Sequence, residues 1–276
     1  MTDIGKKIRM DRIMNRDTKR TIIIPMDHGL SIGPVQGLQN MPEIINKVAK
    51  GGANAVVLHK GIISTGYRGY GEDVGMIMHL SGSSNLGRYG GNKVEVATVC
   101  EAIKMGADAV SVHINIGSDT ESEQLRYLGR VAGECAEWGM PLLAMMYPRG
   151  KDKDGNKLDP YKAENVAHAA RIGAELGADI IKTNYTGDPE TFKRVVAGCP
   201  VPVITAGGEK TDPPEAFFQS VYESITAGGS GVAAGRNVFQ DKDPISIIQV
   251  LYGIIHEDMT VEKAMKEYQF NLLRIR

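Results

Sequence analysis

The chain has few of the features that mark exported, membrane-bound or nucleic-acid-binding proteins. It contains only three cysteines in 276 residues, and a chain of this length needs no disulfides to hold a core. Its 32 basic and 33 acidic side chains nearly balance, so no basic surface for nucleic acid or anionic lipid is expected. No apolar run approaches about 18 residues, and the basic N-terminus lacks a signal-peptide core. We therefore expect a cytoplasmic protein that binds neither nucleic acid nor membrane.

Glycine, in contrast, is abundant, with 33 residues, and it recurs in a pattern. Four segments combine a helix-ending glycine with a short apolar run, which predicts a helix end, a tight turn and a buried strand. These segments are residues 52–59, 106–113, 177–184 and 229–236. A further apolar run precedes each of them, at residues 21–26, 76–80, 141–147 and 201–205. The sequence therefore predicts eight strands.

Helical patterns separate the predicted strands. They cover residues 41–50, 94–105, 121–138, 162–176, 189–197 and 214–227. This alternation, in a chain near the roughly 250 residues typical of the fold, predicts an α/β protein with a (β/α)8 TIM barrel. We expect one barrel domain over residues 1–276, with a short N-terminal extension at 1–20. An open doubly wound sheet is the alternative, but no G-x-G-x-x-G follows the first strand.

The side chains of the repeated strands alternate between two characters. Counted from the repeat glycine, the even positions are almost wholly apolar or small, and the odd ones carry the polar groups. The polar side chains at odd positions are His59, Ser111, His113, Lys182, Asn184 and Arg236. One face of a barrel strand packs on the helices and the other points to the barrel axis, so we expect the odd face inside. Lys182 then lies near a strand's carboxyl end, where barrel enzymes place catalytic groups.

A lysine inside a barrel is chemically informative. Desolvation favours its neutral amine, and a neutral amine is a nucleophile that can attack a ketone to form a Schiff base. A structural lysine paired with Asp27 is the alternative. Lys60, the rival lysine, sits at an even position after its strand and is expected to face the second loop.

The first predicted strand delivers polar groups directly into a turn. Asp27 and His28 end it, and Gly29, Leu30 and Ser31 follow. In a barrel, this position is the catalytic rim, so an acid and an imidazole there predict a substrate-binding turn. The alternative is that Asp27 only caps the turn.

The fifth predicted strand ends in Tyr147, Pro148 and Arg149. The phenol can donate or accept a proton, and the guanidinium suits a charged substrate. The alternative for Tyr147 is packing at the edge of the core.

Two glycine-rich turns predict a phosphate site. Gly207 and Gly208 follow the seventh strand, and Gly235 and Arg236 follow the eighth. These are the two loops that commonly hold phosphate in this fold. Glycine allows backbone N–H groups to approach an anion, a helix starting at Asn237 adds its dipole, and Arg236 adds charge. Plain turns are the alternative.

The remaining candidates carry weaker signals. His59, His79 and His113 lack metal-ligand spacing, although three histidines can converge at a barrel mouth, and no metal site is predicted. The three cysteines are expected to pack in the core. The glycine-rich stretch 67–73 is interpreted as a lid or an oligomer contact.

Several motifs together resemble the archaeal-type class I aldolase family over nearly the whole chain. They are residues 26–29, 145–150, 181–183 and 206–208. Residues 59–75 and 79–82 further resemble the branch of this family that passes a three-carbon unit to a second aldehyde. Two positions depart from the relatives: Ile32 stands where the fructose-bisphosphate aldolases have a histidine, and Glu209 where the synthases more often have proline.

This resemblance implies a function and a division of roles. Lys182 would form the Schiff base with a ketose phosphate, 6-deoxy-5-ketofructose 1-phosphate, and Tyr147 and Asp27 would move protons. The acceptor would be L-aspartate semialdehyde, in an alternative route to 3-dehydroquinate and the aromatic amino acids. No metal or other cofactor is implied, since the iminium is the electron sink. The family further suggests a homo-oligomer, a decamer.

Two other functions remain open at this stage. A class I fructose-bisphosphate aldolase would use the same lysine but release both trioses. A barrel that binds a phosphosugar without turning it over would not form a Schiff base at all.

Overall fold

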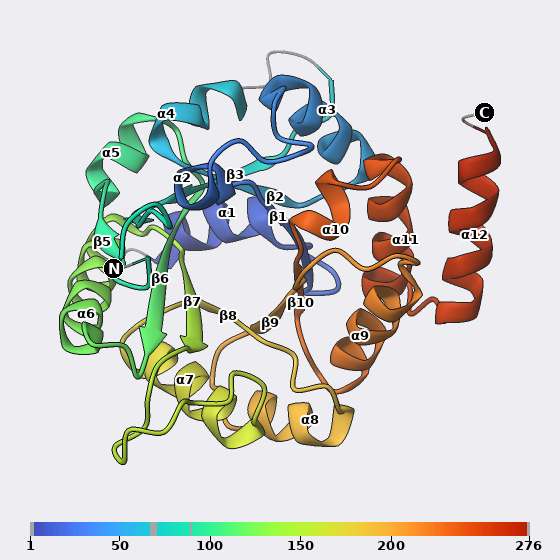
Figure 1. Cartoon of the computed structure of the whole chain (residues 1–276). Coiled ribbons are helices and arrows are strands. Elements are labelled where there is room, and N and C mark those ends of the chain that lie inside the picture. Colours follow the sequence, from blue (N-terminus) through green and yellow to red (C-terminus); the bar gives the residue numbers. More distant parts are fainter. Residues whose placement is uncertain (1–2, 67–70, 89, 275–276) are drawn as a thin grey trace.

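A closed parallel barrel forms the centre of the molecule (Figure 1). The computed structural model describes residues 3–66, 71–88 and 90–274. The strands run around the barrel in the order β1-β10-β9-β8-β7-β6-β3-β2. Their bounds are β1 Thr21–Pro25, β2 Ala55–Leu58, β3 Gly75–His79, β6 Ala109–Ile116, β7 Leu142–Pro148, β8 Ile180–Thr183, β9 Val203–Ala206 and β10 Gly231–Ala233. The predicted TIM barrel and its eight strands are confirmed, and the open sheet is excluded.

Helices surround the barrel and cover its outer face (Figure 1). They are α3 Met41–Gly51, α5 Val99–Lys104, α6 Glu121–Trp138, α7 Ala163–Glu175, α8 Pro189–Ala197, α9 Glu215–Thr226 and α11 Pro244–His256. The last helix, α12 Val261–Arg274, packs outside α11 and α9. Short helical turns follow three of the strands: α2 His28–Ile32 follows β1, α4 Lys60–Ile63 and η1 Ser64–Gly66 follow β2, and α10 Arg236–Phe239 follows β10.

The helix expected at 94–105 is partly wrong. Val94–Glu95 forms strand β5, which pairs antiparallel with β4 Ser81–Gly82, and the helix begins only at Val99. Thr98 sets that start through a capping box, in which its side chain accepts from the Glu101 N–H and the Glu101 carboxylate accepts from the Thr98 N–H. The T-x-x-E spacing is visible in the sequence, so the boundary could have been found there.

The glycine repeat has a structural reason beyond the turn itself. The Asn or Asp two residues after each of the first three repeat glycines accepts a hydrogen bond from the backbone of the preceding barrel strand. Asn54 accepts from Ile22 N–H at 2.8 Å, Asp108 from Met76 at 2.9 Å and Asp179 from Leu142 at 2.8 Å. Each side chain thus satisfies a backbone donor near the start of a strand and fixes the register of a strand pair.

The fourth repeat is shifted by one residue from the predicted frame. Gly228, not Gly229, takes the left-handed conformation of the other repeat glycines, with φ +97° against +98° at Gly52. The inward positions of β10 are consequently Gly231 and Ala233, and Ala234 packs outward. The parity argument therefore holds for β2, β6 and β8 and is wrong for β10, because two adjacent glycines made the frame ambiguous.

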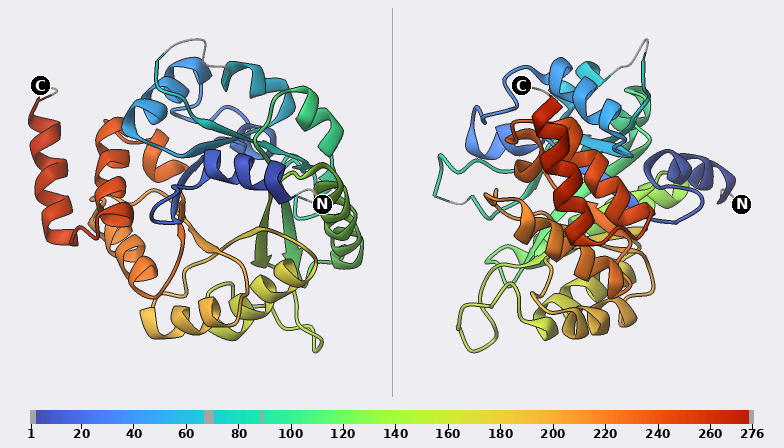
Figure 2. Two further views of the ribbon diagram at one scale, coloured as in Figure 1. Left: turned by 180° about the vertical axis from the view of Figure 1, so that it is seen from behind. Right: turned by 90° about the vertical axis from the view of Figure 1, so that its right-hand side faces the viewer.

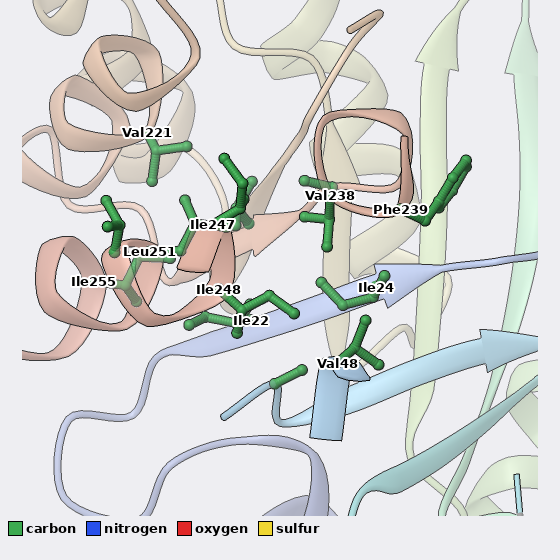
Figure 3. Packing of buried hydrophobic residues seen from close by; sticks show 14 of the residues in the cluster. Ile22, Ile24, Val48, Val221, Val238, Phe239, Ile247, Ile248, Leu251 and Ile255 are labelled. Atoms are coloured by element: carbon green, nitrogen blue, oxygen red, sulfur yellow. The ribbon is translucent and has the colours of Figure 1, made fainter. Parts of the chain in front are cut away.

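The alternating faces of the strands divide the core into an inner and an outer part. On β1, Ile23 belongs to the cluster inside the barrel, whereas Ile22 and Ile24 point to the helices. Figure 3 shows Ile22 beside Ile248 of α11 and Ile24 near Val48 and Val238, all within one cluster. Truncating such a fully buried isoleucine to alanine costs about 2 to 5 kcal/mol of stability. Because this inner layer is apolar, the polar side chains that could react with a substrate lie at the ends of the strands.

The N-terminal segment closes the base of the barrel. Helix α1 Asp3–Ile13 lies across this end in the left view of Figure 2. Its Lys6 pairs with Asp179 at 3.0 Å, and Arg12 pairs with Asp108. Ile13 follows into the inner core. The extension expected at 1–20 is therefore largely helical, and substrate access is left to the opposite end.

The three cysteines differ in their exposure to solvent. Cys135 and Cys199 are buried as expected, but Cys100 is exposed, because it occupies an outward position at the start of α5.

Residues 67–70 of the expected lid stretch lie outside the described residues. No helix within the described ranges has the length and apolar character that crossing a membrane requires.

Candidate active site

A cavity of about 1160 Å³ opens at the carboxyl ends of the barrel strands. Ten of the residues predicted for the site line it: Asp27, His28, Ser31, Tyr147, Arg149, Lys182, Gly207, Gly208, Gly235 and Arg236. They come from five different strands and the loops that follow them. The fold thus brings together side chains that lie up to about 200 positions apart in the sequence.

Lys182 sits inside the barrel near the end of β8. Its side chain lines the cavity and only 7% of the residue is exposed. It lies beside Met145 of β7 and Ile204 of β9 in the strand register, and both neighbours are apolar. Lys60 instead begins α4 outside the cavity, where it pairs with Glu101 at 3.1 Å. Of the two lysines compared, Lys182 is the one placed to meet a substrate.

Asp27 lies across the cavity in a group of imidazoles. Its carboxylate is 3.7 Å from His79 Nε2 and 3.9 Å from His28 Nδ1. Burial by itself raises the pKa of Asp27, but the charges of His79, His28 and Lys182 outweigh it and hold the pKa well below its usual range. Burial also lowers the pKa of His79 to about 4, so this imidazole is neutral near pH 7. The Asp27 carboxylate is therefore ionised, and it interacts electrostatically with Lys182, which lines the same cavity.

Tyr147 is held by its neighbours at the end of β7. Only 4% of the residue is exposed, yet it lines the cavity. The Arg149 guanidinium lies 4.2 Å from the centre of the tyrosine ring, and the ring of His113 lies 5.1 Å away. A ring packed in this way presents its phenol in a fixed position, which proton transfer requires.

The two glycine turns meet at the other side of Lys182. A Cβ atom on Gly235 would lie 2.7 Å from His28 Cε1 and 2.8 Å from a backbone oxygen, so only glycine fits there. Gly208 has a φ of +69°, which also favours glycine. Helix α10 begins at Arg236, one residue before the expected start. Side-chain-free backbone therefore borders this part of the cavity.

Arg236 carries the charge of this region. Its Nε is buried and has no hydrogen-bond partner in the protein, and its Nη1 lies 3.4 Å from Glu209 Oε1. The Glu209 side chain is 88% exposed, so this ion pair is weak. Arg236 reaches the cavity from the turn after β10, at the start of α10, so its predicted inward position on the strand is wrong.

Asn237 is a site residue that the sequence did not reveal as such. Its Nδ2 donates to the backbone oxygens of Gly207 at 2.7 Å and Glu209 at 2.9 Å, and its Oδ1 accepts from the Thr211 N–H at 2.9 Å. This buried amide therefore ties the turn after β9 to the turn after β10. An asparagine next to Arg236 in a glycine turn was the available signal, but its partners lie about 30 residues away.

Three predicted residues do not line the cavity. Gly29 and Leu30 lie on α2, and Leu30 is 40% exposed. Pro148 lines a smaller adjoining cavity of about 320 Å³ that shares Arg149, Tyr161 and Asn184 with the main one. Their assignment to substrate remains a prediction.

The histidines do gather at the barrel mouth. His59 and His79 lie with ring centres 5.2 Å apart, and His113 lines the same cavity. His79 shares a 2.8 Å hydrogen bond with Ser111, and His113 donates to Asn115 at 2.9 Å. Over residues 3–66, 71–88 and 90–274, no three His, Cys, Asp or Glu side chains are grouped so that they could hold a metal ion.

The fold and this arrangement of groups define an aldolase of the Schiff-base type, and comparison agrees. A model of the DeoC/LacD family aldolases matches residues 21–241. The chain belongs to this family.

Three named proteins are similar to this chain over more than nine tenths of its length. The chain is 43% identical over 270 residues to 2-amino-3,7-dideoxy-D-threo-hept-6-ulosonate synthase 1 of Archaeoglobus fulgidus, with 98% of each chain covered. It is 36% identical over 256 residues to 2-amino-4,5-dihydroxy-6-oxo-7-(phosphonooxy)heptanoate synthase of Streptomyces griseus, covering 93% of this chain and 92% of the other. An archaeal fructose-1,6-bisphosphate aldolase whose catalytic lysine carries the carbinolamine intermediate superposes with a TM-score of 0.80, at 34% identity over 91% of this chain and 99% of the other.

Proposed function

We propose that this chain transfers a three-carbon unit from 6-deoxy-5-ketofructose 1-phosphate to L-aspartate semialdehyde, forming 2-amino-3,7-dideoxy-D-threo-hept-6-ulosonate. The observation that carries the proposal is the convergence of Lys182, Tyr147 and Asp27 on one cavity. Similarity to the A. fulgidus synthase over 98% of the chain supports this substrate pair. The product would enter an alternative route to 3-dehydroquinate and the aromatic amino acids.

Lys182 would carry the carbon skeleton through the reaction. Its neutral amine attacks the donor ketone, and loss of water gives an iminium. The bond between the α and β carbons of the iminium then breaks as the β-hydroxyl loses its proton. The bonding electrons pass to the iminium nitrogen, which leaves a three-carbon enamine on Lys182, and the β carbon departs as the aldehyde of hydroxypyruvaldehyde phosphate. The enamine carbon then attacks the aldehyde of L-aspartate semialdehyde, and water hydrolyses the new iminium to free the product and the lysine. No metal is required, because the iminium accepts the electrons.

Asp27 and Tyr147 would share the proton transfers. Water leaves when the iminium forms, and a hydroxyl loses its proton when the carbon–carbon bond breaks. The ionised carboxylate of Asp27 is a base, and the phenol of Tyr147 is an acid. They lie on β1 and β7, on two sides of Lys182 of β8 in the barrel order, so each can reach a different part of the bound donor.

Arg236 and the turns at Gly207, Gly208 and Gly235 would hold the donor phosphate. The buried Nε of Arg236 without a partner supports this role, because a buried guanidinium donor needs an acceptor. The surrounding glycines allow an anion to approach the backbone. His28, Ser31 and Arg149 would contact other parts of the substrates.

We further propose where the enzyme acts and how it assembles. It would act in the cytoplasm on small molecules, without nucleic acid or membrane as partner, and as a homo-oligomer, for which the family resemblance suggests a decamer. Light scattering of the purified chain measures that assembly directly.

One experiment tests the proposed chemistry. Borohydride is added to the enzyme with the ketose phosphate, and the modified peptide is identified by mass spectrometry. Mass on the peptide containing Lys182, and none in the Lys182→Ala variant, is expected. Mass on Lys60 would overturn the assignment, and the absence of any adduct would favour a barrel that binds a phosphosugar without reacting.

A class I fructose-bisphosphate aldolase is the second candidate. The 34% identity to the archaeal aldolase with a carbinolamine on its lysine favours it. Turnover with and without L-aspartate semialdehyde separates the two. A transaldolase needs the acceptor for rapid turnover, whereas an aldolase cleaves fructose 1,6-bisphosphate alone.

A further inference from the structure

The cavity contains a second cationic region, on the side of Lys182 away from Arg236. Lys93 and Arg149 both line the cavity wall. Arg149 follows β7, and Lys93 lies on the hairpin of β4 and β5, which follows β3. In the barrel order, β8 separates β9 and β10 from β7, β6 and β3. Lys182 therefore stands between Arg236 on one side and the pair Lys93 and Arg149 on the other.

Both cations of this pair have hydrogen-bonding capacity left for a ligand. Lys93 Nζ donates to Ser83 Oγ at 2.6 Å, which leaves further donors of the ammonium for a ligand. Arg149 packs on the Tyr147 ring at 4.2 Å. In the described part of the chain, no salt bridge joins either of them to a carboxylate, although the negative charge of Asp27 acts to raise the pKa of Lys93 against burial, which lowers it. Lys93 is partly buried, Arg149 is exposed, and the charge of Arg149 lowers the pKa of Lys93, so an anion bound between the two cations would stabilise both.

The hairpin that carries Lys93 is built into the site. Ser83 Oγ donates to the Gly90 oxygen at 2.6 Å while it accepts from Lys93. Asn115 of β6 donates to the Gly91 oxygen at 2.8 Å, so the hairpin is tied to the barrel wall. Its ammonium is therefore held in place before any ligand arrives, which reduces the entropy lost on binding.

We propose that Lys93 and Arg149 form a subsite for the carboxylate of the amino-acid aldehyde acceptor. This inference rests on the proposed function, whose acceptor brings a carboxylate into the cavity after the phosphorylated fragment has left. L-Aspartate semialdehyde has only two carbons between its aldehyde and its carboxylate. The carboxylate must therefore bind close to the group that protonates the reacting aldehyde. Arg149 stacks on Tyr147, the proposed acid, and so meets this requirement.

The test pairs a side-chain change with a substrate change. L-Aspartate semialdehyde is compared with 3-aminopropanal, which lacks only the carboxylate, as acceptors for wild type and Lys93→Met. A charge-assisted contact predicts that Lys93→Met lowers kcat/KM for L-aspartate semialdehyde about 10- to 100-fold and for 3-aminopropanal less than about 3-fold. Lys93→Arg keeps the charge and should restore part of the loss. The matched control Lys60→Met, an exposed lysine outside the cavity, should leave both values unchanged.

Three outcomes would overturn the subsite: no effect of Lys93→Met, equal losses for both aldehydes, or a higher KM for the ketose phosphate alone, which would assign Lys93 to the phosphate. Borohydride trapping with the ketose phosphate runs alongside and should succeed in every Lys93 variant. If wild type traps the donor but never uses L-aspartate semialdehyde, the proposed function fails. If wild type uses it and Lys93→Met does so equally well, only the subsite fails.

Discussion

Tyr147→Phe removes one oxygen from the cavity and little else. The ring is 96% buried against Arg149 and His113, and phenylalanine keeps those contacts. Folding stability should therefore change by less than about 1 kcal/mol. General acid catalysis contributes about 100- to 10,000-fold. Converted at about 1.4 kcal/mol per tenfold change, the barrier rises by roughly 3 to 5 kcal/mol, far more than the effect on folding.

The assay is kcat for the full transfer, with both substrates saturating. The control is Tyr161→Phe, a second tyrosine of the cavity lining that is 58% exposed and has no assigned role in proton transfer. We expect a loss of at least 100-fold for Tyr147→Phe and less than about 2-fold for Tyr161→Phe, with equal melting temperatures. If Tyr147→Phe kept nearly full kcat, the phenol would be a packing group, and the acid–base role would pass to Asp27 or His28.

Three further changes test other parts of the site. Arg236→Ala should raise KM for the ketose phosphate by about 10- to 100-fold in steady-state kinetics and leave trapping at Lys182 possible, and an unchanged KM would place the phosphate elsewhere. Asp27→Asn should slow borohydride trapping together with turnover; normal trapping would restrict Asp27 to later steps. His79 has a folded pKa of about 4, below the usual value near 6.5, so the unfolded chain binds this proton first and stability should fall as pH drops from about 6.5 to 4. Thermal melts should show a shallower fall for His79→Gln, and identical slopes would contradict the assignment.

The fold was predictable because local signals and long-range packing agree. Residues 121–138 and 189–197 are helices with the expected bounds, since each has a regular apolar face and a clear end. The error at 94–105 arose because two extended residues pair with a hairpin partner that no local pattern reveals. Tertiary pairing there overrides helix propensity.

The alternation of side chains predicts the direction of a residue on a strand, but not that of a residue in a loop. Lys182 follows from the alternation of β8, because one face must pack on helices. Lys93 and Asn237 lie in loops, whose direction depends on contacts made by distant residues. A sequence pattern of period two gives no information about such positions.

The Asn and Asp side chains at the base of the barrel divide it into units for recombination. Asn54 joins β2 to β1, Asp108 joins β6 to β3 and Asp179 joins β8 to β7, so each clamp lies within one pair of neighbouring strands. A chimera with another barrel of the family that exchanges whole pairs keeps every clamp intact. A junction between β7 and β8 separates Asp179 from the Leu142 N–H and leaves that donor to whatever residue the other parent supplies. Crossover points before β3, β7 or β9 should therefore give folded hybrids more often than points inside a pair.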